Sequence, residues 1–167
     1  MQAVRNRTCT LITRGSDYFC MHLPKIPLLV ALLLAAVSAS GCMSQETVVS
    51  DDVKAEMLAY ADPIADNLMQ GFNEGNYTMY SRDFSPEMRQ ALDEGAFEQN
   101  REHVTSRIGL YESRSDPIVT ETGEHIAVNY RAKFEQEDGV ALRFVFKKGD
   151  PSHRLHGLWF NSPKLRS

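Results

Sequence analysis

Apolar residues follow three different patterns along this chain. Residues 26–37 are almost wholly apolar, residues 52–73 repeat apolar positions every three or four residues, and residues 126–147 alternate apolar with polar positions. The first pattern is typical of a secretory leader, because the run is about a dozen residues long and a membrane-spanning helix needs about 20. The second pattern predicts an amphipathic helix, and the third predicts antiparallel strands.

The helical half of the chain is predicted to end at Gly109. Pro63 lies inside the apolar stripe of the first helix, so we expect that helix to be kinked or split near residues 59–62. Asn76 and Ser85 are good N-terminal caps. Asn76-Tyr77-Thr78 also matches a glycosylation sequon, which stays a second interpretation of Asn76. The predicted helices cover residues 52–73, 76–84, 86–93 and 96–108.

Four strands are predicted after Gly109, over residues 110–115, 126–134, 140–147 and 155–162. Both middle strands carry their apolar residues at even numbers, so paired residue numbers must sum to an even value. A three-residue loop, Glu137-Asp138-Gly139, satisfies this rule and pairs Phe134 with Leu142. Apolar residues of the last strand fall at both odd and even numbers, and Gly157 is expected to mark a bend or bulge there.

Helices followed by antiparallel strands predict an α+β fold, with N-terminal helices packed against a curved sheet of about four strands. The helical segment 61–109 and the segment Gly157-Leu158-Trp159-Phe160-Asn161-Ser162-Pro163 resemble the family called domain of unknown function 3887. That resemblance implies a cone-shaped fold of the cystatin-like, nuclear-transport-factor-2-like kind, with a long helix held in the curve of the sheet.

Cys42 is the residue to which the sequence assigns the clearest role. Ala39-Ser40-Gly41-Cys42 follows the apolar run and resembles the lipobox of bacterial and archaeal lipoproteins, which implies a diacylglycerol on Cys42 and cleavage before it. We therefore expect a signal peptide over residues 1–41, a lipidated tether over 42–50 and a single domain over 51–167. The alternatives are an ordinary signal peptide cleaved near Ala39, or an uncleaved anchor helix.

The first 20 residues do not fit a compact leader. We interpret them as a start assigned too early, with translation from Met21, and the alternative is an unusually long basic region. Removal of residues 1–41 takes away four basic residues and one acidic residue, so the net charge changes from −4 to −7. An acidic domain argues against nucleic acid as a partner. Membrane attachment is then expected through the lipid on Cys42.

No sequence motif identifies a reaction. The four histidines after Cys42 lack metal-ligand spacing, so no metal or other cofactor is expected. Acid–base chemistry inside a cone fold would have to use residues from a scattered set, of which none is assigned a catalytic role. Trp159 and Phe160 beside Tyr111 could form a ligand-facing aromatic patch, although packing in the core is the favoured interpretation. The scattered set consists of Tyr60, Asp62, Asp66, Asp83, Asn129, Tyr130 and His156.

The sequence thus predicts an extracytoplasmic, membrane-anchored lipoprotein whose biochemical role is open. A module that binds a partner protein or a small apolar ligand is favoured over an enzyme, because an anchor is present and a catalytic motif is not. The alternatives are a small enzyme with an acid–base site in the cone, and a structural envelope protein that associates with itself.

Overall fold

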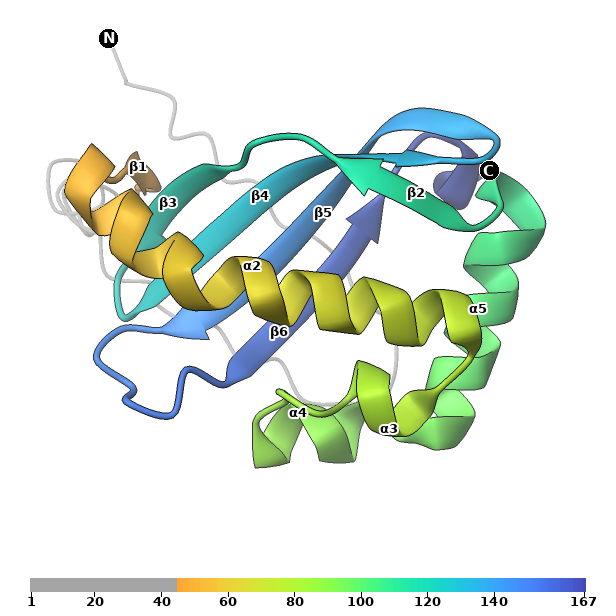
Figure 1. The fold of residues 1–167 in the computed structure, drawn as a ribbon. Helices are drawn as coiled ribbons and strands as arrows, with labels where there is room; N and C mark the ends of the chain where they lie inside the picture. Colours follow the sequence, from red (N-terminus) through yellow and green to blue (C-terminus); the bar gives the residue numbers. More distant parts are fainter. Residues whose placement is uncertain (1–44) are drawn as a thin grey trace, which may run out of the picture. The chain divides into compact units, whose positions relative to one another are not determined.

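The computed structural model describes residues 45–167, which form an α+β unit of helices followed by an open antiparallel sheet of six strands. The predicted signal peptide, Cys42 and the start of the predicted tether lie outside the described residues. Figure 1 shows the long helix α2 lying across one face of the sheet. The helices are α2 (Asp51–Glu74), α3 (Tyr77–Tyr80), α4 (Pro86–Ala91), α5 (Glu94–Ile108) and a terminal 3-10 turn, η1 (Lys164–Arg166).

Local capping signals set the end of α2 and the starts of α3 and α4, whereas α3 and α4 are shorter than the predicted helices over 76–84 and 86–93. Gly75 ends α2 in the left-handed conformation, with φ of 67°. The side chains of Asn76 and Ser85 accept hydrogen bonds from Met79 N–H and Met88 N–H. Asp93 caps α5, which therefore begins two residues earlier than expected. The predicted split at Pro63 is wrong, since α2 runs unbroken through it.

The helix α2 tolerates Pro63 because the residues on either side are anchored in the core. Pro63 is exposed, so its ring faces solvent, while Ala61, Ile64 and Ala65 are buried. Proline removes one backbone donor from a helix. Burial of the flanking apolar stripe holds the helix together across that gap. The apolar stripe predicted for this helix is buried except at its first residue, Val53; its buried members are Met57, Ala61, Ile64, Ala65, Leu68, Met69 and Phe72.

The sheet has the order β1-β3-β4-β5-β6, and β2 pairs with the same edge of β4 as β3 does. Six strands replace the four predicted, because β3 and β1 were missed. β1 belongs to the segment that the sequence assigned to the tether. The strands are β1 (Thr47–Val48), β2 (Tyr111–Arg114), β3 (Ile118–Thr122), β4 (His125–Phe134), β5 (Glu137–Lys147) and β6 (Leu155–Asn161).

The strands β4 and β5 pair in the predicted even register, but the turn between them differs from the predicted one. Phe134 pairs with Glu137 across a two-residue turn, so the predicted three-residue loop is wrong. Between this pair and the pair of Ala132 with Val140, β5 contains one residue more than β4. This bulge includes Gly139, whose φ is 75°, and it restores the even sum that keeps both apolar faces inward.

Large aromatic side chains fill the space between α2 and the sheet. Phe72 comes from α2, Phe134 from β4 and Phe144 from β5, and each is at most 2% exposed. The ring centroids of Phe72 and Phe134 are 6.4 Å apart in an edge-on arrangement. The interior of the predicted cone is therefore packed with side chains at this point.

Candidate functional site

A row of four side chains crosses the face of the sheet that points away from α2. Ile118 lies opposite Asn129, Asn129 opposite Arg143, and Arg143 opposite Trp159, so the row runs over β3, β4, β5 and β6. Directly opposed residues of neighbouring strands share one face. The intervening residues of β4 and β5 point the other way and are buried beneath α2. We call this surface the outer face.

The two ends of the row are apolar and exposed. Trp159 is 54% exposed and Ile118 is 60% exposed. Three strand spacings separate them, about 14 Å. A groove of about 800 Å³ lies between them. It is lined by Glu46, Asp116, Ile118, Thr120, Asn129, Tyr130, Arg131, Ala141, Leu142, Arg143, Trp159, Phe160 and Asn161.

Hydrogen bonds hold the polar centre of the outer face in place. Arg143 Nη1 donates to Glu46 Oε1 and to Asn129 Oδ1, at 2.9 Å in each case. Thr120 Oγ1 also donates to Glu46. These bonds fix the segment before β1 against the sheet. They lower the pKa of the Glu46 carboxyl, with the Thr120 hydroxyl as the largest cause and the Arg143 guanidinium as the next.

We expect the carboxyl of Glu46 to titrate below its ordinary pKa of 4.5 in the folded chain. Because folding lowers this pKa, the contact stabilises the fold fully above about pH 4.5 and is lost as the pH falls through the lowered pKa. A carbon-detected NMR titration of the Glu46 carboxyl measures the value. Thr120→Val and Arg143→Met should each raise it. A wild-type pKa equal to that of the chain unfolded in urea would contradict the prediction.

The position of Trp159 depends on a glycine. A Cβ atom at Gly157 would lie 2.4 Å from Cη2 of Trp159, so the indole ring lies directly over Gly157. β6 contains one residue more than β5 between Leu155 and Gly157, which is the bulge that Gly157 was expected to mark. The bulge places Leu155 in the core and Trp159 on the outer face.

The outer face offers groups that suit contact with another molecule. The indole of Trp159 offers a flat apolar surface for stacking, and Asn161 and Arg131 offer hydrogen-bond donors beside it. Arg131 makes one long contact, 3.4 Å from Nη1 to Gly139 O, and it faces no carboxylate in the described chain. No group of three metal-ligating side chains occurs among residues 45–167.

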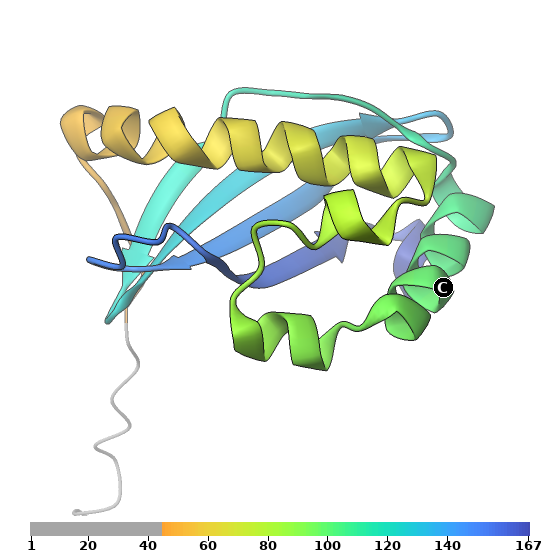
Figure 2. The same ribbon diagram turned by 60° about the horizontal axis from the view of Figure 1, so that its bottom comes forward.

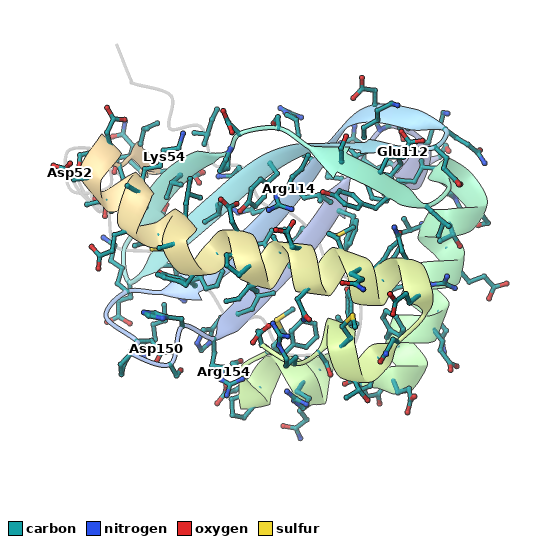
Figure 3. The ribbon with its side chains drawn as sticks, in the orientation of Figure 1. Asp52, Lys54, Glu112, Arg114, Asp150 and Arg154 are labelled. Atoms are coloured by element: carbon teal, nitrogen blue, oxygen red, sulfur yellow. The ribbon has the colours of Figure 1, made fainter. Side chains whose placement is uncertain are left out.

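Three of the seven acid–base candidates do meet, on the inner side of the sheet. The hydroxyl of Tyr130 donates to Asp62 Oδ1 at 2.8 Å. Arg114 bonds to Asp66 and lies 3.4 Å from Asp62 Oδ1, with its guanidinium 5.0 Å from the centre of the Tyr130 ring. In Figure 3, Arg114 lies between β2 and α2. Sequence reasoning missed Arg114, because no periodicity marks it.

This cluster ties β2 and β4 to α2. Tyr130 is 2% exposed, and burial, followed by its hydrogen bond to Asp62, raises the pKa of its hydroxyl. The hydroxyl therefore stays protonated and donates to the carboxylate. Arg114 is charged as well, since the Asp66 carboxylate raises its pKa against the cost of burial. The protonated Tyr130 and the paired Arg114 thus hold β4 and β2 against α2.

The other four candidates lie apart from one another. Tyr60 stacks on His153, with ring centroids 3.9 Å apart, and burial raises its pKa to about 12. Asp83 pairs with Arg82 at 3.0 Å. Asn129 lies in the row on the outer face. His156 Nε2 is 3.7 Å from Asp150 Oδ2, beyond hydrogen-bond distance.

Comparison with protein families gives one match, over residues 65–150, to the family described as "Protein of unknown function (DUF3887)". The chain belongs to the DUF3887 family. This confirms the family to which the sequence showed a resemblance. Comparison with curated proteins gives no match, and comparison with solved structures gives none either.

The DUF3887 match begins in the middle of α2 and ends just after β5. It includes three of the four residues in the outer-face row, and Trp159 lies beyond it. The helices of this DUF3887 protein that the structure describes include none long and apolar enough to cross a membrane.

The predicted aromatic patch of this DUF3887 protein is divided between the two faces of the sheet. Phe160 packs inward, 5.5 Å from Phe72 between ring centroids, and Tyr111 packs 5.8 Å from Phe134. Core packing is thus the correct interpretation for these two residues. It is wrong for Trp159, which the bulge in β6 turns outward.

Proposed function

We propose that this DUF3887 protein is an extracytoplasmic lipoprotein that binds a partner protein or a small ligand through the outer face of its sheet. The observation that carries the proposal is the row from Ile118 to Trp159, with its exposed apolar ends and its ordered polar centre. Large exposed apolar side chains beside a groove are a common mark of binding surfaces. Tryptophan and arginine in particular dominate the energetics of many interfaces.

The anchor is the second part of the proposal. The apolar run at 26–37 and the lipobox-like residues 39–42 support lipid on Cys42. Two acyl chains hold a small domain at a membrane, because each buried methylene contributes about 0.8 kcal/mol. A net charge of −7 after cleavage gives the domain little electrostatic attraction to anionic lipid. The membrane contact is therefore assigned to Cys42.

We also infer that the domain has a cystatin-like cone fold. A long helix across one face of an antiparallel sheet supports a place among the cystatin-like cone folds. The interior that such folds can leave open for catalysis is occupied here by Phe72, Phe134 and Phe144. This packing favours the binding role over the alternative of an acid–base enzyme.

We expect a photoreactive amino acid at position 159 to capture the partner in living cells. The same reagent at Lys54 is the matched control, because Lys54 lies near the start of α2 (Figure 3), away from the outer face. Arg143→Glu should abolish the adduct at position 159 by removing the polar centre of the groove. The sizes of adducts distinguish a protein from a small ligand.

Two results would contradict this assignment of the outer face. Equal adducts at positions 159 and 54 would mean that contact is random. An adduct of twice the mass of the chain would favour the structural alternative, in which the protein associates with itself. In either case the anchor at Cys42 would still be tested separately.

We expect Cys42→Ser to remove the protein from the membrane fraction and to stop cleavage before residue 42. Fractionation of cells and intact mass measurement of the product check both effects. Cys20→Ser is the control, and it should leave both the mass added by lipid and the fractionation unchanged. A Cys42→Ser chain that is still cleaved and still membrane-bound would contradict the lipid anchor.

A further inference from the structure

One edge of β6 is only partly used. β6 is the last strand of the sheet, so no strand of the described chain lies beyond it. At its first residue, Leu155 N–H donates to Asp83 O and Leu155 O accepts from Ser85 N–H, both at 2.8 Å. These two bonds form a parallel bridge between Leu155 and Phe84. The chain therefore already pairs one short extended segment with this edge.

The next backbone groups on that edge belong to Leu158 and Phe160. In antiparallel sheets the N–H and C=O of successive residues alternate between the two edges of a strand. Leu155, Leu158 and Phe160 face even-numbered residues of β5, which are Phe146, Phe144 and Leu142. Residues in equivalent positions of the ladder point their backbone N–H and C=O to the same edge of the strand. The backbone groups of Leu158 and Phe160 therefore point to the open edge, as those of Leu155 do. No backbone group within residues 45–167 bonds to Leu158 or Phe160 from that side.

A groove of about 600 Å³ runs beside this edge. In Figure 2, α4 and α5 curl around the side of the sheet where β6 lies. Four apolar side chains of the lining are only partly buried, so the protein leaves apolar area uncovered there: Leu92, Leu158, Phe160 and Leu165. The deeper apolar lining consists of Phe72, Tyr80, Met88, Phe97 and Val104. We call this site the β6-edge groove.

The charge of the β6-edge groove favours an anion. Arg101, His103 and Arg166 line it, and Glu87 is the one carboxylate among its described lining residues. Arg101 donates to the carbonyls of Phe72 and Asn73, and Arg166 donates to the Asn161 amide oxygen. Neither arginine faces a carboxylate in the described chain. Their positive charge in this groove is therefore not neutralised by the fold.

We propose that the β6-edge groove binds an extended peptide segment of a partner protein, which adds to β6 as a further strand. Its backbone pairs with Leu158 and Phe160, its alternate apolar side chains cover the partly buried leucines, and an acidic residue lies near Arg166. An acyl chain would cover the same apolar area but would leave the backbone groups of β6 without partners. The peptide accounts for both features. The β6-edge groove adjoins the outer face at Trp159, which lines both grooves, but the backbone edge of β6 that the peptide would pair with belongs to this groove.

The test uses the full chain as it is expressed and an acetylated, amidated probe peptide of sequence Val-Thr-Val-Thr-Glu. Calorimetry measures its affinity, and hydrogen exchange followed by NMR locates it. We expect saturable binding that slows exchange at the amides of Leu158 and Phe160. Methylation of the peptide's backbone nitrogens should weaken binding at least about tenfold, because the lost donors cannot pair with β6. Replacement of its glutamate by lysine should also weaken binding.

Variants of the protein separate the backbone contribution from the charge contribution. Leu158→Pro removes an N–H that the sheet does not use, and Gly157 before it has no Cβ to clash with the proline ring. The chain should stay folded and bind the peptide about tenfold more weakly. Arg166→Glu should weaken binding roughly threefold to tenfold. Lys54→Glu, the same charge change at a distant site, should have no effect.

Three results would overturn the proposal. The first is equal affinity for the methylated and unmethylated peptides. The second is unchanged affinity in both Leu158→Pro and Arg166→Glu. The third is saturable binding of palmitate without binding of any alternating peptide, which would assign the groove to an acyl chain.

Discussion

Phe72→Ala is expected to lower the free energy of unfolding by about 3–5 kcal/mol. Phe72 is 2% exposed and is in contact range of three other aromatic rings, those of Tyr80, Phe134 and Phe160. These rings come from α3, β4 and β6, so the substitution in α2 opens a cavity where two helices and two strands meet. Urea denaturation measures the change, with an unchanged dependence on urea as the sign of two-state unfolding.

Phe72→Leu is the matched control for the cavity. Leucine keeps most of the apolar volume, so we expect a loss of less than about 1.5 kcal/mol. If Phe72→Ala cost no more than Phe72→Leu, the aromatic cluster would not be the centre of the core.

Gly71→Ala is expected to destabilise the fold by about 2–3 kcal/mol. Helix propensity alone would predict the opposite, because alanine favours a helix more than glycine does. A Cβ at Gly71 would lie 2.5 Å from Tyr80 N and 2.9 Å from Tyr80 Cα. Both atoms belong to the backbone of α3, so the contact can be relieved only by moving that helix away from α2. Thermal and urea unfolding of the variant measure the cost.

Gly95→Ala, at a second helical glycine, is expected to stabilise the fold. A Cβ there would meet only Asp93 Oδ1, at an ordinary contact distance of 3.6 Å. We expect a gain of about 0.5–1 kcal/mol, because alanine restricts the unfolded chain and favours the helix. A gain in both variants would mean that α2 and α3 are not in close backbone contact at Gly71.

Features of the fold that depend on neighbours in the sequence could be predicted. Asn76, Ser85 and Gly75 cap helices through groups three or four residues away, and the stripe of α2 follows from its own period. β3 depends instead on β4 across the sheet. Of its five residues only Val119 is buried, so its sequence shows no run of alternating apolar positions.

The register of the sheet shows how far pattern reasoning extends. The even sum for β4 and β5 follows from the apolar positions alone, and the structure has it. The bulge that produces it, near Gly139, is one of several backbone solutions to the same constraint. The apolar pattern predicts which side chains face the core, but it does not predict which turn or bulge puts them there.

The candidate site was harder to predict for the same reason. The outward direction of Trp159 follows from the extra residue in β6, and apolar residues at both odd and even positions conceal that shift. Arg114 meets Asp62 and Asp66 only because β2 and α2 are brought together by the fold. The sequence pattern alone gives no sign of either contact.

Trp159 is the single tryptophan of the chain. Light near 295 nm excites tryptophan selectively, so the emission of the whole protein comes from one ring on the outer face. Acrylamide should quench that emission in the free protein, and a bound partner should shield it. The protein thus contains a native optical reporter at the surface where we place its binding function.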